Sequence, residues 1–324
     1  MKKEDALKSY NTFQQYFIEE FADDYQEGLL SRRSFVRRLA FITGSMTAAN
    51  TVMTALGLGT VEVSSPEVLP PDPTLFAAQT TSVEGAQSPY SVPSGDPAIQ
   101  ASEVTFPSQD SEISAYFARP TETGVFPGIL VCHENRGLNV HIKDVTRRFA
   151  KDGYVALAID LLSREGGTSA LDRDQIPGLL GAAGADRHVI DFLAGFGFLQ
   201  GLDEVDAERI GMTGYCFGGG ITWRVATALP DLKAAVPFYG PAPDLAQVGN
   251  IKAAVLGVYA ELDSRINAGN DALEQALKAA GTTYQFNVYP GVNHAFHNDT
   301  GRRYVEAQAT QAWLDTLAWF ETHL

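Results

Sequence analysis

From about residue 111 to the C-terminus, strand-like apolar runs alternate with helix-like segments, and this alternation constrains the fold more than any other feature. The runs "FPGILVCHE" (126–134) and "YVALAID" (154–160) are nearly all apolar, as expected of strands buried on both faces. Between them lies a helix-like segment, 141–153, that ends at a glycine. Alternating strands and helices form a mostly parallel sheet with helices on both faces. We therefore predict an α/β fold whose functional residues lie beyond the carboxyl ends of the strands.

The same pattern predicts one domain over residues 101–324. Its remaining predicted elements are an edge strand at 111–120, strands at 209–216, 232–240, 252–263 and 284–290, and helices at about 184–200, 217–229, 270–281 and 302–322. Residues 61–100 are rich in proline and predict an extended linker. Residues 1–60 predict an N-terminal arm of helices.

Part of this arm resembles an export signal. The sequence Ser31-Arg32-Arg33-x-Phe35-Val36-Arg37 is similar to the twin-arginine motif, and a charge-free, moderately apolar run follows from Leu39 to Val61. That run is too polar for a transmembrane helix. The segment 31–59 therefore predicts export to the periplasm by the twin-arginine machinery. The alternative is a basic helix followed by an Ala-rich helix packed on the domain of a cytoplasmic protein. The arm also predicts homo-oligomer formation.

Composition excludes several classes of partner and cofactor. The chain has 324 residues, 45% of them hydrophobic, and a formal net charge of −15, which argues against binding to nucleic acid or to anionic membranes. Its two cysteines, Cys132 and Cys216, are too few for a disulfide framework and show no metal-ligand spacing. We predict a soluble globular protein with no metal and no organic cofactor.

The stretch "GMTGYCFGGGITW" (211–223) has the form of a nucleophile turn, in which a strand passes through Gly-x-Cys-x-Gly into a helix. The start of a helix favours thiolate over thiol at Cys216, and the amide of Phe217 would face a developing oxyanion. Alone, such a turn favours a small buried cysteine over a nucleophile. Three further residues of catalytic type, however, are predicted at the same edge of the sheet.

Those residues are Glu134, Asp263 and His294. The order nucleophile, acid, histidine is that of α/β-hydrolase triads. His294 would act as the base, with His297 as its competitor, and Asp263 would orient the imidazole, with Glu261 as its competitor.

Glu134 in "VCHENRGL" is an unusual addition, since a carboxylate beside the sulfur disfavours the thiolate. It would hold the thiol protonated until substrate arrives or accept the proton itself. The alternative is a salt bridge with Arg136. The amide of Asn135 would be a second oxyanion donor. Cys132 is expected to pack beneath the site, and a disulfide with Cys216 in an oxidising compartment stays open.

The motifs "HENRGL", "GYCFGGG", "YAELD" and "NHAF" together resemble those of the dienelactone hydrolases (carboxymethylenebutenolidases) over about residues 103–322. The resemblance implies an α/β-hydrolase fold, a triad of Cys216, Asp263 and His294, and no cofactor. It also implies that Glu134 accepts the thiol proton once substrate binds.

One departure concerns the substrate. Family members that open dienelactone place an arginine shortly after the histidine, where this chain has Asn298. Candidate substrate contacts are therefore Arg136, His297 and Asn298, and dienelactone itself is not specified. We predict hydrolysis of a lactone or small ester through an acyl-thioester. The alternatives are a general carboxylesterase or thioesterase, and a non-catalytic binding or assembly module on the same scaffold.

Overall fold

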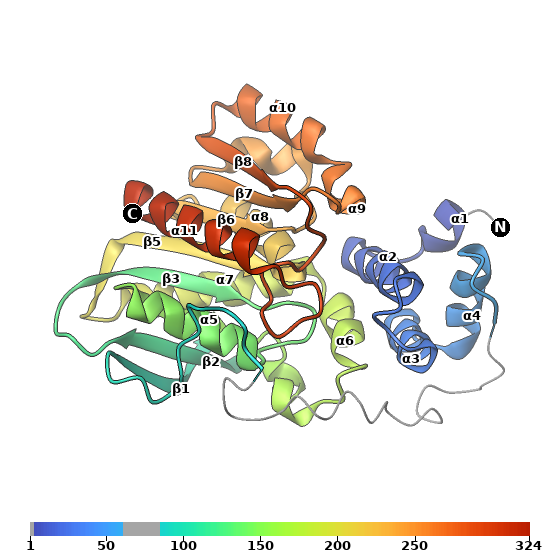
Figure 1. Ribbon diagram of the computed structural model, residues 1–324, viewed down its shortest axis with the longest axis horizontal. Helices are drawn as coiled ribbons and strands as arrows, with labels where there is room; N and C mark the ends of the chain where they lie inside the picture. Colours follow the sequence, from blue (N-terminus) through green and yellow to red (C-terminus); the bar gives the residue numbers. More distant parts are fainter. Residues whose placement is uncertain (1–2, 61–84) are drawn as a thin grey trace. The chain divides into compact units, whose positions relative to one another are not determined.

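The computed structural model describes residues 3–60 and 85–324, and its chain divides into two compact units (Figure 1). Unit 1 combines the N-terminal residues 1–79 with residues 165–187, and unit 2 contains residues 80–164 and 188–324. Boundaries drawn along the sequence did not anticipate that 165–187 would join the N-terminal helices. Most of the predicted linker, residues 61–84, lies outside the described residues, and residues 85–98 form neither helix nor strand.

Unit 2 is built on an eight-stranded sheet with the order β1-β2-β4-β3-β5-β6-β7-β8. The strands are β1 Ile99–Ser108, β2 Ser111–Pro120, β3 Phe126–Cys132, β4 Val155–Ile159, β5 Val205–Tyr215, β6 Ala234–Phe238, β7 Ala254–Ala260 and β8 Tyr284–Tyr289. The pairs β1–β2 and β2–β4 are antiparallel, and every pair from β4 to β8 is parallel. The segment predicted as the edge strand is β2, which β1 covers on its outer side. The prediction missed β1.

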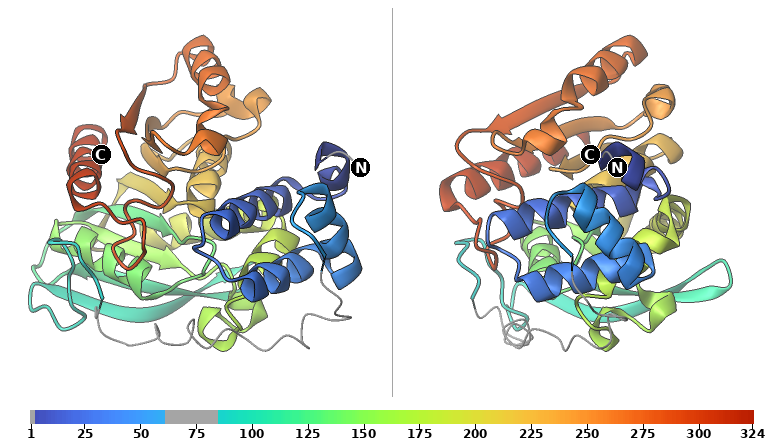
Figure 2. Two further views of the ribbon diagram at one scale, coloured as in Figure 1. Left: turned by 45° about the vertical axis from the view of Figure 1, so that its right-hand side comes forward. Right: turned by 90° about the vertical axis from the view of Figure 1, so that its right-hand side faces the viewer.

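Helices cover both faces of this sheet (Figures 1 and 2). Those of unit 2 are α5 Val140–Lys151, α7 Ala185–Gln200 (which starts in unit 1), α8 Phe217–Ala228, α9 Ser264–Asn267, α10 Asn270–Ala280 and α11 Glu306–His323, with short 3₁₀ turns η3 Ser163–Glu165 and η5 Leu245–Asn250. Helices α5 and α11 lie on one face, where the rings of Phe149 and Trp313 meet at 4.6 Å, and α7 and α8 lie on the other. The predicted mostly parallel sheet with helices on both faces is confirmed.

Unit 1 is helical. It contains α1 Lys3–Leu7, α2 Thr12–Gln26, α3 Arg32–Thr43, α4 Met46–Ala55, the 3₁₀ turn η4 Thr168–Ala170 and α6 Ile176–Ala183. Helix α6 packs closely on the N-terminal helices, because a Cβ at Gly178 would lie 2.9 Å from the backbone carbon of Phe41. The side chain of Asn11 also donates to the carbonyl of Gly181 at 2.8 Å. The N-terminal helices and residues 165–187 thus share one core.

Buried ion pairs join α3 to the segment before α6. Asp174 accepts from Arg37 Nε at 3.1 Å and from Arg38 Nε at 2.9 Å, and Arg37 also donates to Asp172 at 2.8 Å. The side chains of Arg37 and Arg38 are each 3% exposed, and that of Asp174 is 1% exposed. Arginine is suited to such sites because its planar fork can be satisfied by several acceptors at once.

We expect Asp174→Ala to destabilise unit 1 by about 3–5 kcal/mol, because it leaves two arginines buried without a shared counter-charge. Hydrogen exchange at the amides of α3 measures this loss within the unit. Asp186→Ala is the matched control, since Asp186 is an exposed carboxylate of the same unit. Equal protection of α3 in both variants would contradict the prediction.

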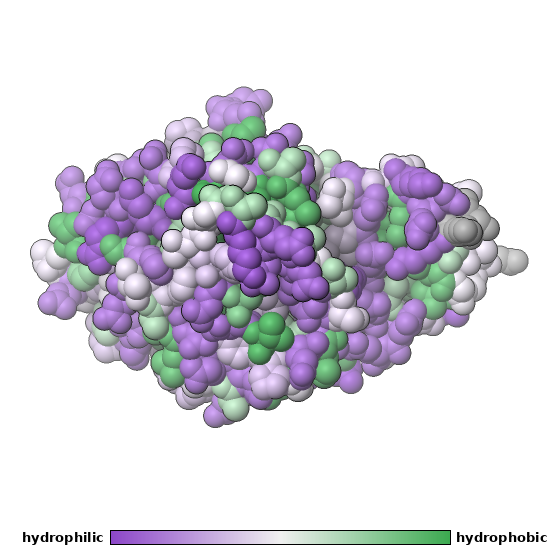
Figure 3. Space-filling view, turned by 90° about the horizontal axis from the view of Figure 1, so that it is seen from above, coloured by the Kyte–Doolittle hydropathy of each residue, from purple (hydrophilic) through white to green (hydrophobic). Residues whose placement is uncertain are grey.

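The visible surface is mainly polar (Figure 3). On the face that Figure 3 shows, hydrophilic residues predominate and apolar residues occur in small groups. Across residues 3–60 and 85–324, none of the helices has both the length and the hydrophobicity needed to cross a membrane. Isolated apolar side chains such as Leu262, 57% exposed, are ordinary for a folded domain.

Candidate active site

Cys216 occupies a strained turn between β5 and α8. Its φ of 60° lies in the left-handed region, which costs a non-glycine residue about 1–3 kcal/mol. The flanking glycines are required by close approach: a Cβ at Gly214 would lie 2.3 Å from the carbonyl oxygen of Gly218, and one at Gly218 would lie 2.5 Å from that of His133. Strain that the surrounding packing maintains at a polar residue is typical of a functional position. The expected strand-turn-helix geometry is present.

His294 is paired with Asp263. Its Nδ1 lies 2.6 Å from Asp263 Oδ2, while Asp263 Oδ1 accepts from the amide of Ile266 at 3.3 Å. Burial alone would raise the pKa of Asp263, but the charge of His294 and its hydrogen bond outweigh burial and lower it. The carboxylate is therefore ionised and orients the imidazole. Asp263 lies three residues beyond the end of β7, as the N-cap of α9, and not at the end of the strand as predicted.

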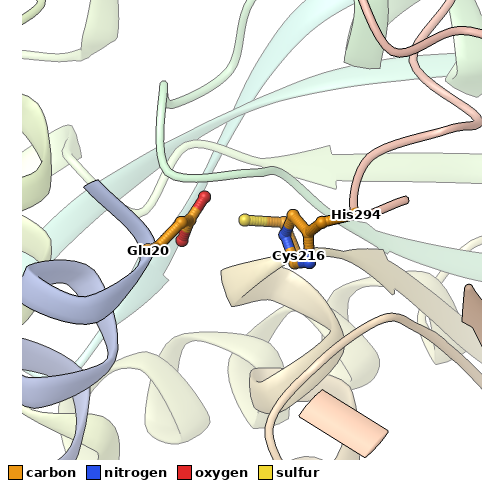
Figure 4. Close-up of side chains that lie close together, drawn as sticks. All are labelled: Glu20, Cys216 and His294. Carbon is orange, nitrogen blue, oxygen red and sulfur yellow. The ribbon is translucent and has the colours of Figure 1, made fainter. Parts of the chain in front are cut away.

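The sulfur of Cys216 lies within 4.8 Å of a ring nitrogen of His294 (Figure 4). The imidazole is thus placed within reach of the sulfur, and such contacts commonly tighten further when substrate binds. The ring of Tyr239 flanks the imidazole with centroids 4.9 Å apart. Tyr239 follows β6, the neighbour of β5, and has an unusual φ of 37°. Two strained residues thus lie at the carboxyl ends of adjacent strands.

Glu134 is held by Asn298. The amide Nδ2 of Asn298 donates to Glu134 Oε2 at 2.6 Å, and Thr300 donates to Asn298 Oδ1 from its amide and its hydroxyl, which sets the orientation of the amide group. Arg136 is exposed, and no ion pair joins it to Glu134 in the described part of the chain. The geometry therefore favours a carboxylate held by a neutral donor over the salt bridge considered from sequence.

The loop that carries His294 is anchored by its neighbour Asp299. This carboxylate accepts from His141 at 2.8 Å, from Arg148 at 2.7 Å and from the amide of Ser88 at 3.1 Å. Burial would raise the pKa of Asp299, but the hydrogen bond from His141 and the charge of Arg148 lower it strongly. The loop thereby gains a fixed connection to α5.

His297 lies in the interior, apart from the Asp263–His294 pair. Its ring stacks on Tyr215 at 5.1 Å and packs near Phe238 and Trp313. Burial, followed by the charge of Arg148, lowers its pKa well below the ordinary value, so the ring is neutral. This packing supports His294 over His297 as the base and makes His297 part of the core.

The two proposed oxyanion donors are backbone amides, one at the start of a helix and the other in a loop. Phe217 is the first residue of α8, and the first backbone amides of a helix point out of its N-terminal end. Asn135 lies in the turn after β3, in which the amide of Gly137 donates to the carbonyl of Glu134 at 3.2 Å. Both positions suit amides aimed at a developing negative charge.

Cys132 is buried in β3 and is paired in register with Gly214 of β5. Burial raises its pKa well above the ordinary value, so it is a neutral thiol. Neither cysteine is in a disulfide. Its position is consistent with packing beneath the turn that carries Cys216.

Comparison with known proteins identifies the family. The sequence profile of the dienelactone hydrolase family matches residues 113–324. This chain belongs to the dienelactone hydrolase family. A protein of Methylorubrum extorquens named as a carboxymethylenebutenolidase is 38% identical over 260 residues, covering 76% of this chain and 86% of that protein. Another of that name, from Escherichia coli K12, is 35% identical over 243 residues, covering 70% and 89%.

A solved structure agrees with these relatives. A crystal structure named as a dienelactone hydrolase, from Klebsiella pneumoniae, superposes with a TM-score of 0.65 at 34% identity, covering 70% of this chain and all of that one. The α/β-hydrolase fold is thereby confirmed, and the chain is a carboxylic-ester hydrolase acting on a small lactone or ester. The family match begins after the N-terminal helices.

Sequence reasoning missed three residues around this site: Tyr239, Asp299 and His133. Tyr239 had a signal, since it directly follows a buried strand, where ligand-facing residues occur in α/β sheets. Asp299 had none, because its partner His141 is far away in the sequence, and the tautomer of His133 is set by the distant amide of Leu161.

Proposed function

We propose that the enzyme hydrolyses neutral lactones or small esters with Cys216 as nucleophile, His294 as base and Asp263 as the residue that orients it. The observation that carries the proposal is the 2.6 Å pair of Asp263 and His294 with the sulfur of Cys216 within 4.8 Å of the imidazole. Nδ1 of His294 is bound to the carboxylate, so Nε2 is the nitrogen available for proton transfer.

The reaction has two halves. The sulfur forms a bond to the substrate carbonyl carbon, and the amides of Phe217 and Asn135 hold the resulting oxyanion. The carbon–oxygen bond of the ester then breaks, the leaving oxygen takes up the proton that the thiol gave to Glu134, and an acyl-thioester remains. Water attacks this thioester with His294 as base, the carbon–sulfur bond breaks, and the acid is released with the thiol restored.

A neutral substrate is supported by the environment of Asn298. Asn298 is uncharged, and its amide already donates to Glu134. This position therefore offers no positive charge to a substrate carboxylate. A panel of paired lactones and esters, each neutral compound matched with a carboxylate-bearing analogue, tests the proposal. Higher kcat/KM on the neutral member of each pair is expected, and activity on acyl-thioesters alone would favour the thioesterase alternative.

Glu134 is proposed to accept the thiol proton. For Glu134→Gln we expect the rising limb of the pH profile of kcat/KM to move to higher pH by about one unit, because the thiol must then lose its proton without a nearby acceptor. Arg136→Gln, in the same loop, is the matched control and should leave the profile unchanged. A limb that moves to lower pH would show that Glu134 acts only by repelling the thiolate, and an unmoved limb would remove it from the reaction.

Chemical labelling tests whether Cys216 is the reactive cysteine expected of an enzyme and not of the non-catalytic module considered from sequence. A thiol-reactive probe should modify Cys216 much faster than Cys132, because only Cys216 lies beside a base and at the start of a helix. Equal and slow labelling of both cysteines would contradict Cys216 as the nucleophile.

We propose that residues 31–59 are retained helices and not a removed export signal. Phe35 of the twin-arginine-like motif is fully buried and stacks on Tyr25 at 4.9 Å, and Arg37 is bound to Asp172 and Asp174. Removing these helices would uncover the face of α6 that packs on Phe41. The intact mass of protein produced with a functional twin-arginine pathway tests this, and cleavage near residue 60 would support the export prediction instead.

A further inference from the structure

His133 is a fully buried imidazole beside the proposed site, and the mechanism above does not use it. Its Nε2 accepts from the amide of Leu161 at 3.3 Å. A nitrogen that accepts from an amide carries no proton, so in the neutral ring the proton is on Nδ1. That Nδ1 donates to the carbonyl of Glu134 at 2.7 Å. Burial, partly offset by the charge of Asp160, lowers the pKa of His133, which keeps the ring neutral.

This hydrogen bond sets the plane of one peptide. The Glu134 carbonyl accepts both from His133 and from the amide of Gly137 at 3.2 Å. The peptide that joins Glu134 to Asn135 is trans, as are all peptides in the described part of the chain. In a trans peptide the C=O and N–H bonds point in opposite directions. Fixing the carbonyl of Glu134 on the imidazole therefore aims the amide of Asn135 away from it.

His133 also adjoins the turn that carries Cys216. A Cβ at Gly218 would lie 2.5 Å from the carbonyl oxygen of His133, so the first turn of α8 is in direct contact with the end of β3. The rings of His133 and Phe217 are nearly parallel, with centroids 6.5 Å apart. His133 thus lies next to both segments that supply the candidate oxyanion donors, its side chain bonded to the Glu134 carbonyl and its backbone against the start of α8.

We propose that His133 is a positioning residue for the oxyanion hole, whose Nδ1–H hydrogen bond to the Glu134 carbonyl sets the direction of the Asn135 amide. The proposal rests on the hydrolase mechanism above. It goes beyond that mechanism because it gives His133, as a neutral imidazole in one tautomer, the task of orienting the Asn135 amide. The competing role is purely structural, a tie between the ends of β3 and β4 through Leu161.

Two variants separate these roles, because each keeps one nitrogen position of the imidazole. His133→Asn places an amide N–H near the position of Nδ1 and keeps the donor to Glu134. His133→Gln places its amide oxygen near the position of Nε2, keeps the acceptor for Leu161 and loses the Nδ1 donor. We expect His133→Gln to lower kcat about 10²-fold with little change in KM, since an oxyanion donor acts in the transition state. His133→Asn should retain most of the wild-type kcat.

The measurement uses the full chain and the neutral ester preferred by the wild type, with kcat expressed per reactive Cys216 after titration with a thiol probe. This normalisation removes losses from misfolded enzyme. A larger loss of kcat in His133→Asn than in His133→Gln would overturn the positioning role. An equal loss of kcat in both variants, in proportion to their loss of thermal stability, would overturn it as well. A wild type that hydrolyses no ester or lactone would overturn the proposed function and this inference together.

Discussion

Replacing Cys216 by alanine should reduce ester turnover by a factor of about 10⁶, the scale seen when a hydrolase loses its nucleophile. The sulfur of Cys216 lies within 4.8 Å of a His294 ring nitrogen, and Cys216 occupies a strained turn at the start of a helix. Without the sulfur, the acyl-enzyme cannot form, and the oxyanion donors alone supply only a small residual rate. The measurement is initial-rate kinetics on the neutral ester that the wild type prefers.

Cys132→Ala is the matched control for this variant. It removes the other cysteine of the chain, which is a buried neutral thiol, and should lower stability and leave kcat unchanged.

Cys216→Ser tests whether the reaction requires sulfur. A serine variant that retains most of the activity would show that sulfur is not needed, and an alanine variant with full activity would refute the nucleophile.

The second large effect is expected at Asp263. Asp263→Asn should lower kcat about 10⁴-fold, because an asparagine amide leaves the imidazole in the wrong tautomer and removes the charge that stabilises the imidazolium. The 2.6 Å contact to His294 and the lowered pKa of Asp263 both show that the ionised form is the one held in the fold.

Glu261→Gln is the control for Asp263. Glu261 is the exposed carboxylate two residues earlier, and its Oε2 accepts from the amide of Gly291 at 2.8 Å. We expect that change to leave kcat nearly unaltered. Similar losses in the two variants would mean that the loop as a whole, and not the carboxylate of Asp263, supports the reaction.

The lowered pKa of Asp263 also predicts how the stability of the folded protein changes at acidic pH. Its pKa in the folded protein lies below the ordinary 3.8, so its contribution is complete above that value and declines as the pH falls towards the folded-state pKa. Asp263→Asn should therefore reduce the pH dependence of unfolding on the acid side. Urea denaturation of the Cys216→Ala and Cys216→Ala/Asp263→Asn proteins across that range measures the difference.

Local patterns were sufficient for most of unit 2. Continuous apolar runs predicted β3, β4 and β7, because a strand buried on both faces has no polar side to display. The glycines around Cys216 predicted the strand-turn-helix, since only glycine fits where the helix start crosses the backbone of β3. The edge strand β1 was missed, because only Ile99, Phe106 and Ser108 of its ten residues are buried and it follows a proline-rich stretch.

Short stretches of chain were enough to predict the fold class, the family and the order of the catalytic-type residues, because strand periodicity and the nucleophile turn are local patterns. Only the tertiary structure decided which groups are partners. Asn298 holds Glu134 across 164 residues of sequence, and Arg37 and Arg38 meet Asp174, a residue of the segment predicted to belong to the hydrolase domain. Hydrogen bonds and ion pairs of this kind depend on how separate elements pack, and no local pattern specifies that packing.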